Sequence, residues 1–376
     1  MEPKCRFNVI ISASLVLTMS VLIVAQQRAK DDELFPVKVN GRFGYIDTKG
    51  RMVIRPQFDD AHRFQEGLAG VVMGGEKRTG RDGYAFYLGG KFGYIDRTGK
   101  LVVPLGTFSF GRGFSEGLAE VNVNGCKGEN CTGYANKVGK LAIKNQFSSG
   151  SEFRQGLAIV EIPGGKRGVI NKNGKFVVPA IYDGVMQISE GIIVANTRVS
   201  GSSDFFDNKL PVYRSVFLDR SGNITARPDH TVIGPFSEGL TQGIITVTVG
   251  SQDHEVHGVV DKMGKFVIEP GFQKVGDFVG GLAPAQIRNK WGFIDQTGKF
   301  VIEPVFDRAN SFRNGLAEIS VNRETGFIDR TGKMVIEPRS WTVEEFSGGH
   351  AFVTENGYVG YIDRTGKYLW KKKFDN

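Results

Sequence analysis

One segment of about 34 residues recurs along this chain, and the recurrence limits the available folds more than any other feature. Its clearest copy spans 290–317 and reads KWGFIDQTGKFVIEPVFDRANSFRNGLA. Related copies follow one another from residue 41 to residue 370. A period of roughly 20 to 50 residues is typical of solenoids and propellers, in which each unit buries its apolar face against its neighbours. We therefore expect one continuous repeat domain.

Each copy opens with a pattern that predicts a β-hairpin. In residues 291–295 (WGFID) successive side chains alternate between the two faces of a short strand. Asp295 can accept backbone N–H groups of the following turn, and Gly298 supplies the left-handed conformation that the turn needs. Residues 300–304 (FVIEP) form the return strand. We expect this strand to end at Pro304, because proline has no N–H for the ladder.

The rest of each copy predicts a connector and a third strand. Residues 305–312 carry two or three apolar anchors, and the glycine-marked turn at 314–317 leads into a strand that ends near Val321. Since no window shows a helical period, we expect three strands per unit and almost no helix.

Two glycines per copy align the repeats. The first lies in the opening strand, and the fifth copy has Val216 in its place; the second precedes the third strand. They are separated by 23 residues in every copy but one, where the separation is 24. From the second glycine to the next first glycine the separation varies from 11 to 26. Insertions therefore occur in one connection only, and we expect them to lie in solvent-exposed loops along one edge of the molecule.

These residues resemble the WG-repeat family. The motif stands as KWGFIDQTGKFVIEP in the seventh copy, with close relatives at 42–56, 91–104 and 359–369. The tryptophan that names the family is present here only as Trp291, and Phe43 and Phe92 replace it in two copies. The resemblance covers about residues 41 to 370, and it implies a β-repeat scaffold rather than an enzyme.

The N-terminal residues have a different character. Lys4 and Arg6 precede an uncharged stretch in which Val9–Ala25 is strongly apolar, which predicts an export signal. Cleavage after Ala25 and retention as a membrane anchor are both open, since the apolar run is just long enough to span a bilayer. Either outcome places the repeats outside the cytoplasm. The chain then divides into a signal or anchor (1–27), a lead-in (28–40), the repeat domain (41–370) and a basic tail (371–376).

Aromatic residues in the insertions are the candidate ligand-binding residues. For the first insertion, 74–90, the alternative is an extended hairpin that covers a sheet edge. For the third insertion, 196–215, the alternative is that its aromatic rings pack onto neighbouring copies. With the single motif tryptophan, the candidates are Tyr84, Phe86, Tyr87, Phe205, Phe206, Tyr213 and Trp291.

Cysteine and histidine residues are the candidate metal ligands of the chain. Cys126 and Cys131 have the spacing of a zinc half-site, but the chain has no second pair to complete it, so we expect a local disulfide in an exported protein. His254 and His257 are separated by two residues, which differs from the HExxH spacing of zinc enzymes, and on a strand they would face opposite sides. We expect no metal and no cofactor.

Charge and motifs argue against several classes of function. The net charge of +8 is spread through the turns rather than clustered, which argues against a nucleic-acid groove, while anionic envelope polymers or lipids could attract it weakly. No phosphate-binding loop is present. The turn aspartates recur once per copy, so capping rather than catalysis explains them.

We therefore expect an all-β protein of about eight three-strand hairpin units in a curved or superhelical stack, with a closed propeller-like ring as the alternative. The expected function is an exported or membrane-anchored scaffold, not an enzyme, that binds a protein or an envelope polysaccharide through its insertion loops. The alternatives are a structural surface protein and a glycan-acting enzyme. The enzyme would need carboxylates outside the repeat pattern, namely Asp204, Asp207, Glu255 and Asp277.

Overall fold

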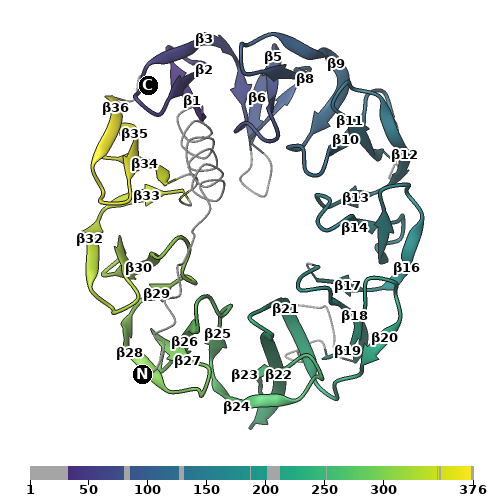
Figure 1. Ribbon diagram of the computed structural model, residues 1–376, viewed down its shortest axis with the longest axis vertical. Coiled ribbons are helices and arrows are strands. Elements are labelled where there is room, and N and C mark those ends of the chain that lie inside the picture. Colours follow the sequence, from purple (N-terminus) through teal and green to yellow (C-terminus); the bar gives the residue numbers. More distant parts are fainter. Residues whose placement is uncertain are drawn as a thin grey trace, which may run out of the picture.

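The computed structural model describes residues 33–79, 85–126, 131–186, 188–200, 212–250, 252–344, 346 and 349–373. These residues form antiparallel sheets that are arranged as the blades of a ring (Figure 1). The all-β repeat architecture is confirmed. Of the two arrangements left open by the sequence, the structure has the ring.

Nine blades are present among the described residues. The seven-stranded sheet contributes two of them, because β9 pairs with β8 at its start and with β10 at its end. Blades 1 to 3 contain β1 (Leu34–Val39), β2 (Arg42–Asp47), β3 (Met52–Phe58); β4 (Asp60–Ala61), β5 (Leu68–Met73), β8 (Lys91–Asp96), β9 (Leu101–Gly111); and β10 (Leu118–Val123), β11 (Thr132–Asn136), β12 (Leu141–Phe147). Blades 4 to 6 contain β13 (Ser149–Gly150), β14 (Leu157–Glu161), β15 (Arg167–Asn171), β16 (Phe176–Tyr182); β17 (Gly184–Val185), β18 (Ile193–Ser200), β19 (Val212–Leu218), β20 (Ile224–Ala226); and β21 (Thr231–Ser237), β22 (Leu240–Val249), β23 (Gln252–Val260), β24 (Phe266–Phe272). Blades 7 to 9 contain β25 (Lys274–Val275), β26 (Leu282–Ile287), β27 (Lys290–Asp295), β28 (Phe300–Phe306); β29 (Arg308–Ala309), β30 (Ala317–Val321), β31 (Glu324–Ile328), β32 (Met334–Arg339); and β33 (Trp341–Val343), β34 (His350–Glu355), β35 (Tyr358–Asp363), β36 (Tyr368–Lys373).

Each blade is shared between two copies of the repeat. The third strand of one copy pairs with the opening strand of the next, as β26 does with β27. The connector adds a short fourth strand, such as β25, which lies nearest the centre of the ring, while the return strand β28 lies at the periphery (Figure 1). The hairpins and third strands predicted from the sequence are confirmed, and their assembly across the copy boundary links every blade to the next.

A bulge in the return strand explains the glycine of the opening strand. Trp291 pairs with Phe306 and Phe293 pairs with Ile302, so two extra residues of β28 are accommodated between these pairs. A Cβ on Gly292 would lie 2.4 Å from the carbonyl oxygen of Ile302, and so only glycine fits. The prediction that the strand ends at Pro304 is wrong: Pro304 lies in the bulge, where no ladder bond is lost, and the strand continues to Phe306.

The apolar core lies between neighbouring blades. Phe293 in β27 packs against Phe312 in the connector of the next blade, with ring centroids 4.8 Å apart. In the first copies a tyrosine takes this place and also donates a hydrogen bond: Tyr94 Oη lies 2.7 Å from the carbonyl oxygen of Arg112. Each aromatic side chain therefore joins its own blade to the following one, as expected for a repeat array in which a unit is stable only beside its neighbours.

The first and last blades meet and close the ring (Figure 1). Phe35 packs against Tyr361 with ring centroids 4.5 Å apart, and the Tyr361 hydroxyl donates to the carbonyl oxygen of Pro36 at 3.1 Å. Arg63 and Glu344 form an ion pair at 3.2 Å across the same junction. The lead-in residues form β1, which takes the place of the third strand in blade 1, and the final half-copy supplies the hairpin of blade 9.

Candidate binding surface

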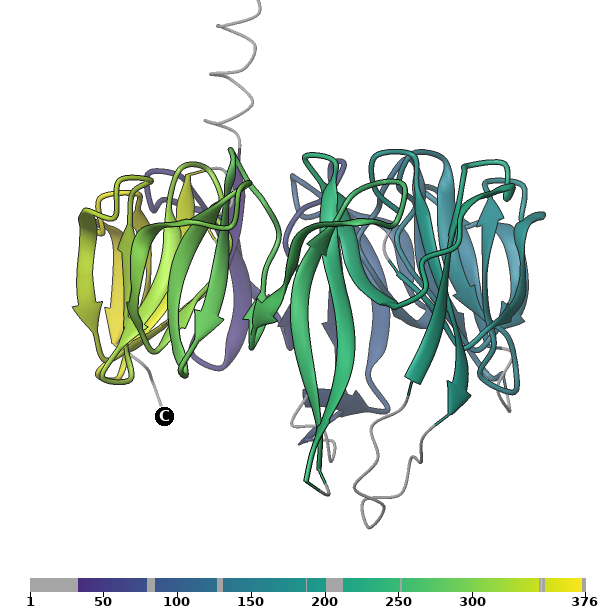
Figure 2. The same cartoon turned by 90° about the horizontal axis from the view of Figure 1, so that it is seen from below.

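The ring has two different faces. At one face, here called the insertion face, the third strand of one copy connects to the opening strand of the next, as β26 does to β27. The long connections lie at this face (Figure 2). At the opposite face, here called the turn face, lie the hairpin turns and the tight turns before each third strand. Leu282 after a tight turn is paired with Asp295 at the start of a hairpin turn, which places both kinds of turn at one end of the blade. The predicted location of the insertions along one edge is confirmed.

The hairpin of β22 and β23 extends beyond the insertion face as a two-stranded ribbon (Figure 2). Ile245, Val247 and Val249 alternate along β22 and are 36%, 38% and 63% exposed. Val256 lies opposite Ile245 and therefore on the same side of the ribbon. We call these four residues the ribbon strip. The other side is polar, and there Thr248 donates a hydrogen bond to Asp253 at 2.8 Å.

The ribbon strip continues the packing surface between blades 5 and 6. Gly243 precedes the strip on the same side of β22 and pairs with Val232, which is buried against Phe217 of blade 5. Asn196 of β18 donates to the carbonyl oxygen of Val232 at 3.0 Å at this junction. The strip therefore faces the side on which β18 and β19 extend, where Val199 is also exposed. His254 and Gln252 pair with Val247 and Val249 and share this side, so the strip is a row of exposed apolar side chains on β22 with polar neighbours on β23.

The predicted aromatic residues do not form a single cluster. Phe86 and Tyr87 lie in β7 (Ala85–Leu88), which pairs with β6 (Glu76–Thr79) as a separate two-stranded sheet. This insertion is thus an extended hairpin, one of the two forms expected for it. Tyr213 lies in β19 at the base of the third insertion, three blades away, and its carbonyl oxygen accepts the Thr231 hydroxyl at 3.0 Å. Tyr84, Phe205 and Phe206 lie outside the described residues.

Trp291 occupies a different environment from the other candidates. It lies in β27, is half-buried, and packs against the core between blades 7 and 8 that includes Phe306. The position that gives the motif its name therefore contributes to blade packing in this chain.

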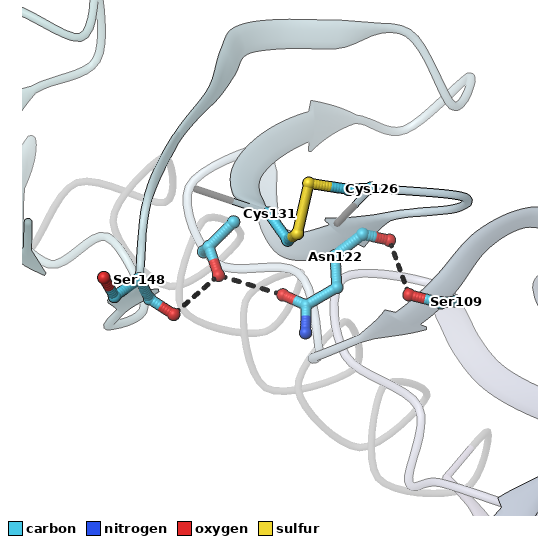
Figure 3. The surroundings of a disulfide bond; sticks show 6 residues. Ser109, Asn122, Cys126, Cys131 and Ser148 are labelled. Atoms are coloured by element: carbon cyan, nitrogen blue, oxygen red, sulfur yellow. Dashed lines mark hydrogen bonds between the residues drawn. A yellow bond between two sulfur atoms is a disulfide. The ribbon is translucent and has the colours of Figure 1, made fainter. Parts of the chain in front are cut away.

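The predicted disulfide is confirmed. Cys126 and Cys131 are joined at the insertion face, between β10 and β11 (Figure 3). The strand ends beside it are held together by side chains: the Thr132 hydroxyl donates to Asn122 Oδ1 at 2.9 Å, and the Ser109 hydroxyl donates to the backbone carbonyl of Asn122 at 3.2 Å (Figure 3). The disulfide closes a short loop beside strand ends that already have their own hydrogen bonds.

The recurring glutamates of the turn face are structural. The Glu66 carboxylate accepts the N–H groups of Glu116 and Gly117 at 2.6 and 3.0 Å, and Lys137 approaches it at 3.1 Å. Glu116 and Glu190 repeat the arrangement with the next tight turn and with a lysine. These side chains link neighbouring blades, so they are not candidates for catalysis.

A cavity on the inner side of the ring was not anticipated from the sequence. It measures about 490 Å³ and is lined in part by Asp277, Ser311, Arg313 and Glu318. Burial raises the pKa of Asp277 and of Glu318, and for Asp277 the neighbouring Arg313 offsets part of this effect. Glu318 occupies a third-strand position at which one other copy has a glutamate, Glu120, another has Gln242, and the rest have apolar residues or glycine. A carboxyl group at a position that is apolar in most copies is the signal through which the cavity could have been found.

The other predicted carboxylates do not join this cavity. Glu255 lies on the polar side of the ribbon, opposite Thr246, while Asp277 lies on the inner side of the ring. Asp204 and Asp207 lie outside the described residues. Within the described ranges, no group of three or more His, Cys, Asp or Glu side chains could hold a metal ion, and the two histidines of the HEVH segment differ: His257 is buried and His254 is exposed.

In the part of the chain that the structure describes, no helix has the length and apolarity needed to cross a bilayer. The predicted signal or anchor, Val9–Ala25, lies outside that part.

Comparison with solved structures finds similar rings at low sequence identity. The crystal structure of a eukaryotic initiation factor matches with a TM-score of 0.57 and 10% identity, over 91% of this chain and 96% of that one. The dihydro-heme d1 dehydrogenase NirN in complex with DHE matches with a TM-score of 0.47 and 11% identity, over 92% and 74%. The β-propeller domain of the Trilobed protease from Pyrococcus furiosus matches with a TM-score of 0.36 and 8% identity, over 74% and 97%. The likeness concerns the fold alone and depends on the first of these structures.

Comparison by sequence identifies the repeats. A search of curated proteins found no match. The family model of the WG-containing repeat matches seven segments, at residues 43–76, 92–125, 133–166, 168–197, 258–291, 291–323 and 326–358. These segments make up more than half of the chain, and the stretch between 197 and 258 that they leave out contains the copy with Val216 in place of glycine. The chain therefore belongs to the family of proteins with WG-containing repeats.

Proposed function

We propose that this protein is an exported binding scaffold without catalytic activity, and that its insertion face holds a protein or an envelope polysaccharide. The observation that carries the proposal is the ribbon strip. Valine and isoleucine side chains at alternate positions of a projecting hairpin remain exposed, although the same alternation is buried within the blades. Exposed contiguous apolar surface is a usual mark of an interaction site.

The proposed location outside the cytoplasm has two supports. The disulfide between Cys126 and Cys131 suits an oxidising compartment, because disulfides seldom persist in the cytosol. The N-terminal sequence, with Lys4 and Arg6 before the apolar run Val9–Ala25, has the pattern of an export signal. Rigid blades that carry variable loops are also a common arrangement for recognition.

The ribbon strip can be tested without changing the fold. The full chain is used as bait in envelope extract, beside the variant Ile245→Thr, Val247→Thr, Val249→Thr. Threonine keeps the β-propensity of these positions and removes apolar surface. The matched control places threonine at three exposed valines of the outer strands: Val267→Thr, Val301→Thr, Val335→Thr. A ligand that the wild type and control retain and the ribbon variant loses supports the proposal, whereas equal capture by all three contradicts it.

An enzyme remains the second candidate because of one observation, the cavity that contains both Asp277 and Glu318. Glycan hydrolysis uses a pair of carboxyl groups in one site, one of which has a raised pKa and acts as the acid while the other is ionised. Release of reducing sugar from envelope glycans, lost in Asp277→Asn and Glu318→Gln, would favour the enzyme over the scaffold. A structural surface protein would instead self-associate and retain no ligand.

A further inference from the structure

Two apolar side chains protrude from the turn face. Val138 and Met263 are 72% and 66% exposed, more than any other large apolar side chain of the described residues. Both occupy the middle of a hairpin turn, where most other copies have a polar residue: Thr98, Asn173, Ser221, Thr297, Thr331 and Thr365. Each is flanked by lysines, in KVGK at 137–140 and KMGK at 262–265.

Most of the net charge of the chain lies on this same face. The nine hairpin turns carry 16 basic and 7 acidic residues, which gives +9; the tight turns add two arginines and four glutamates, and the sum is +9 − 2 = +7. The whole chain has a net charge of +8. The hairpin turns counted are 47–51, 96–100, 136–140, 171–175, 219–223, 261–265, 295–299, 329–333 and 363–367.

The hairpin turns lie at one face of the ring (Figure 2), and the basic residues at the last position of these turns are exposed. They are Arg51, Lys100, Lys140, Lys175, Lys265, Lys299, Lys333 and Lys367. Because each occupies the same position in its blade, the ring presents them to a flat surface and not to a groove.

The N-terminal end of β1 lies at the turn face as well. Leu34 is paired with Asp47, the first residue of a hairpin turn. Residues 26–33 separate Leu34 from the apolar run that ends at Ala25, and an extended chain of that length spans at most about 29 Å. Val9–Ala25, where it is retained as an anchor, would therefore hold the turn face close to the bilayer.

We propose that the turn face binds an anionic lipid surface. Val138 and Met263 insert between headgroups, and the surrounding lysines and arginines attract the lipid phosphates. The N-terminal end of β1, Val138 and Met263 belong to blades 1, 3 and 6 of nine, so these three points are spread around the ring and define a plane. This inference does not depend on what the insertion face binds.

The observations favour a lipid surface over nucleic acid. Acidic residues are interspersed with the basic ones around the ring. They would repel the fixed row of phosphates in a nucleic-acid backbone, whereas lipid headgroups are mobile and can move away from them. Apolar tips between lysines contribute nothing to phosphate recognition, whereas apolar side chains flanked by cations are typical of segments that enter the membrane interface.

The test measures sedimentation of the full chain with phosphatidylcholine vesicles, with and without phosphatidylglycerol. Since Val9–Ala25 contributes to both kinds of vesicle, the readout is the ratio of the two apparent affinities and its dependence on salt. We compare the wild type with Lys140→Gln, Lys265→Gln, Lys299→Gln, Lys333→Gln. The charge-matched control is Lys38→Gln, Lys91→Gln, Lys144→Gln, Lys274→Gln, all away from the turn face.

We expect the wild type to prefer anionic vesicles and salt to weaken this preference. The preference should fall about tenfold or more in the turn variant and remain unchanged in the control. An equal loss in both variants would reveal a general charge effect and overturn the proposal. So would binding of duplex DNA that competes with the vesicles and is lost in the same turn variant, because the surface would then serve nucleic acid.

The apolar tips have their own test. Met263 is exposed in the free chain, so hydrogen peroxide should convert it to the sulfoxide readily, and anionic vesicles should slow the reaction several-fold while neutral vesicles do not. The variant Val138→Thr, Met263→Thr should bind anionic vesicles more weakly, and Val301→Thr, Val305→Thr on the outer strand β28 should not. The Thr variant should fold normally, because threonine already occupies this position in four turns. If anionic vesicles did not protect Met263 from oxidation, or if the two variants bound these vesicles equally well, the proposed insertion of the apolar tips would be wrong.

Discussion

At the scale of single residues, steric fit explains the glycine that aligns the copies. In eight opening strands a Cβ on this glycine would lie between 2.4 and 2.8 Å from a carbonyl oxygen of the return strand. Blade 5 has Val216 instead, and its return strand β20 ends at Ala226, before the bulged segment that would contact this position. In the one copy without the glycine, the ladder between opening and return strand therefore stops at Phe217 and does not reach this position.

Gly292→Ala should therefore destabilise the protein by about 1 to 3 kcal/mol, because the bulge of β28 has to move away from the new methyl group. Urea unfolding followed by circular dichroism measures the change. Gly271→Ala is the matched control, since its Cβ would lie 3.9 Å from the nearest heavy atom, and it should change stability little. Equal effects of the two substitutions would show that the clash at Gly292 is relieved at no cost.

The turn aspartates predict an acid dependence of stability. The Thr297 hydroxyl, together with the N–H groups of Thr297 and Lys299, holds the pKa of Asp295 below its usual range. A carboxylate with a lowered folded pKa stabilises the protein above its unfolded pKa, near 4, and this stabilisation is lost as the pH falls through the folded pKa. Asn136 accepts the equivalent N–H groups without ionising.

We therefore expect Asp96→Asn, Asp295→Asn, Asp329→Asn to keep the melting temperature at neutral pH and to show a smaller decrease below about pH 4 than the wild type. Thermal unfolding across the acid range makes the comparison. The corresponding alanine substitutions should lower the melting temperature at neutral pH, because the turn N–H groups lose their acceptor. A parallel acid decrease in the asparagine variant would mean that other carboxyl groups, such as Asp47, determine it.

At the scale of elements, sequence predicted what is encoded locally. The hairpins follow from alternation and turn residues within about ten positions. Their strands begin close to where they were expected, although the return strand continues past Pro304 to Phe306. The two-residue strands such as β25 are too short to leave a pattern. The pairing of β26 with β27 joins two copies, and only three-dimensional packing specifies it.

The candidate sites were predictable to different degrees for the same reason. Loop lengths placed the insertions on one face. The sequence does not distinguish the ribbon strip, because alternation of threonine with valine or isoleucine is also the pattern of a strand within a blade. The histidines beside it direct attention to a metal site instead. The turn-face charges looked evenly spread along the chain, and only the ring brings them to one side.

The disulfide should have a local effect. Cys126 and Cys131 are five residues apart, and closing so short a loop is worth at most about 2 kcal/mol in the chain-entropy estimate. The strand ends beside it keep the Thr132 to Asn122 hydrogen bond. Cys126→Ser, Cys131→Ser should thus shift the melting temperature by only a few degrees while the connection between β10 and β11 becomes easier to cleave by protease. A collapse of the whole fold on reduction would contradict a local role.

At the scale of the whole molecule, one junction of the ring differs from the other eight. Between consecutive blades the chain passes directly from an outer strand to the next connector, as from β28 to β29. Blade 9 and blade 1 have no such link, and within the described ranges they are joined by side-chain contacts, notably those of Phe35, Tyr361 and the ion pair of Arg63 with Glu344. Blade 1 also has three strands where the complete blades have four. The ring should therefore open first at this junction.

Phe35→Ala, Tyr361→Ala should open the ring while the blades stay folded. Removing both rings takes away the buried contact and the hydrogen bond to Pro36. Phe293→Ala, Phe312→Ala removes the equivalent pair between blades 7 and 8, and each large-to-small change there costs about 3 to 5 kcal/mol. Both variants should melt earlier, but only the first should raise the radius of gyration in small-angle X-ray scattering, with its β circular dichroism signal retained. An unchanged radius in the first variant would mean that the remaining contacts, among them Gly50 against Trp370, are enough to hold the last blade to the first.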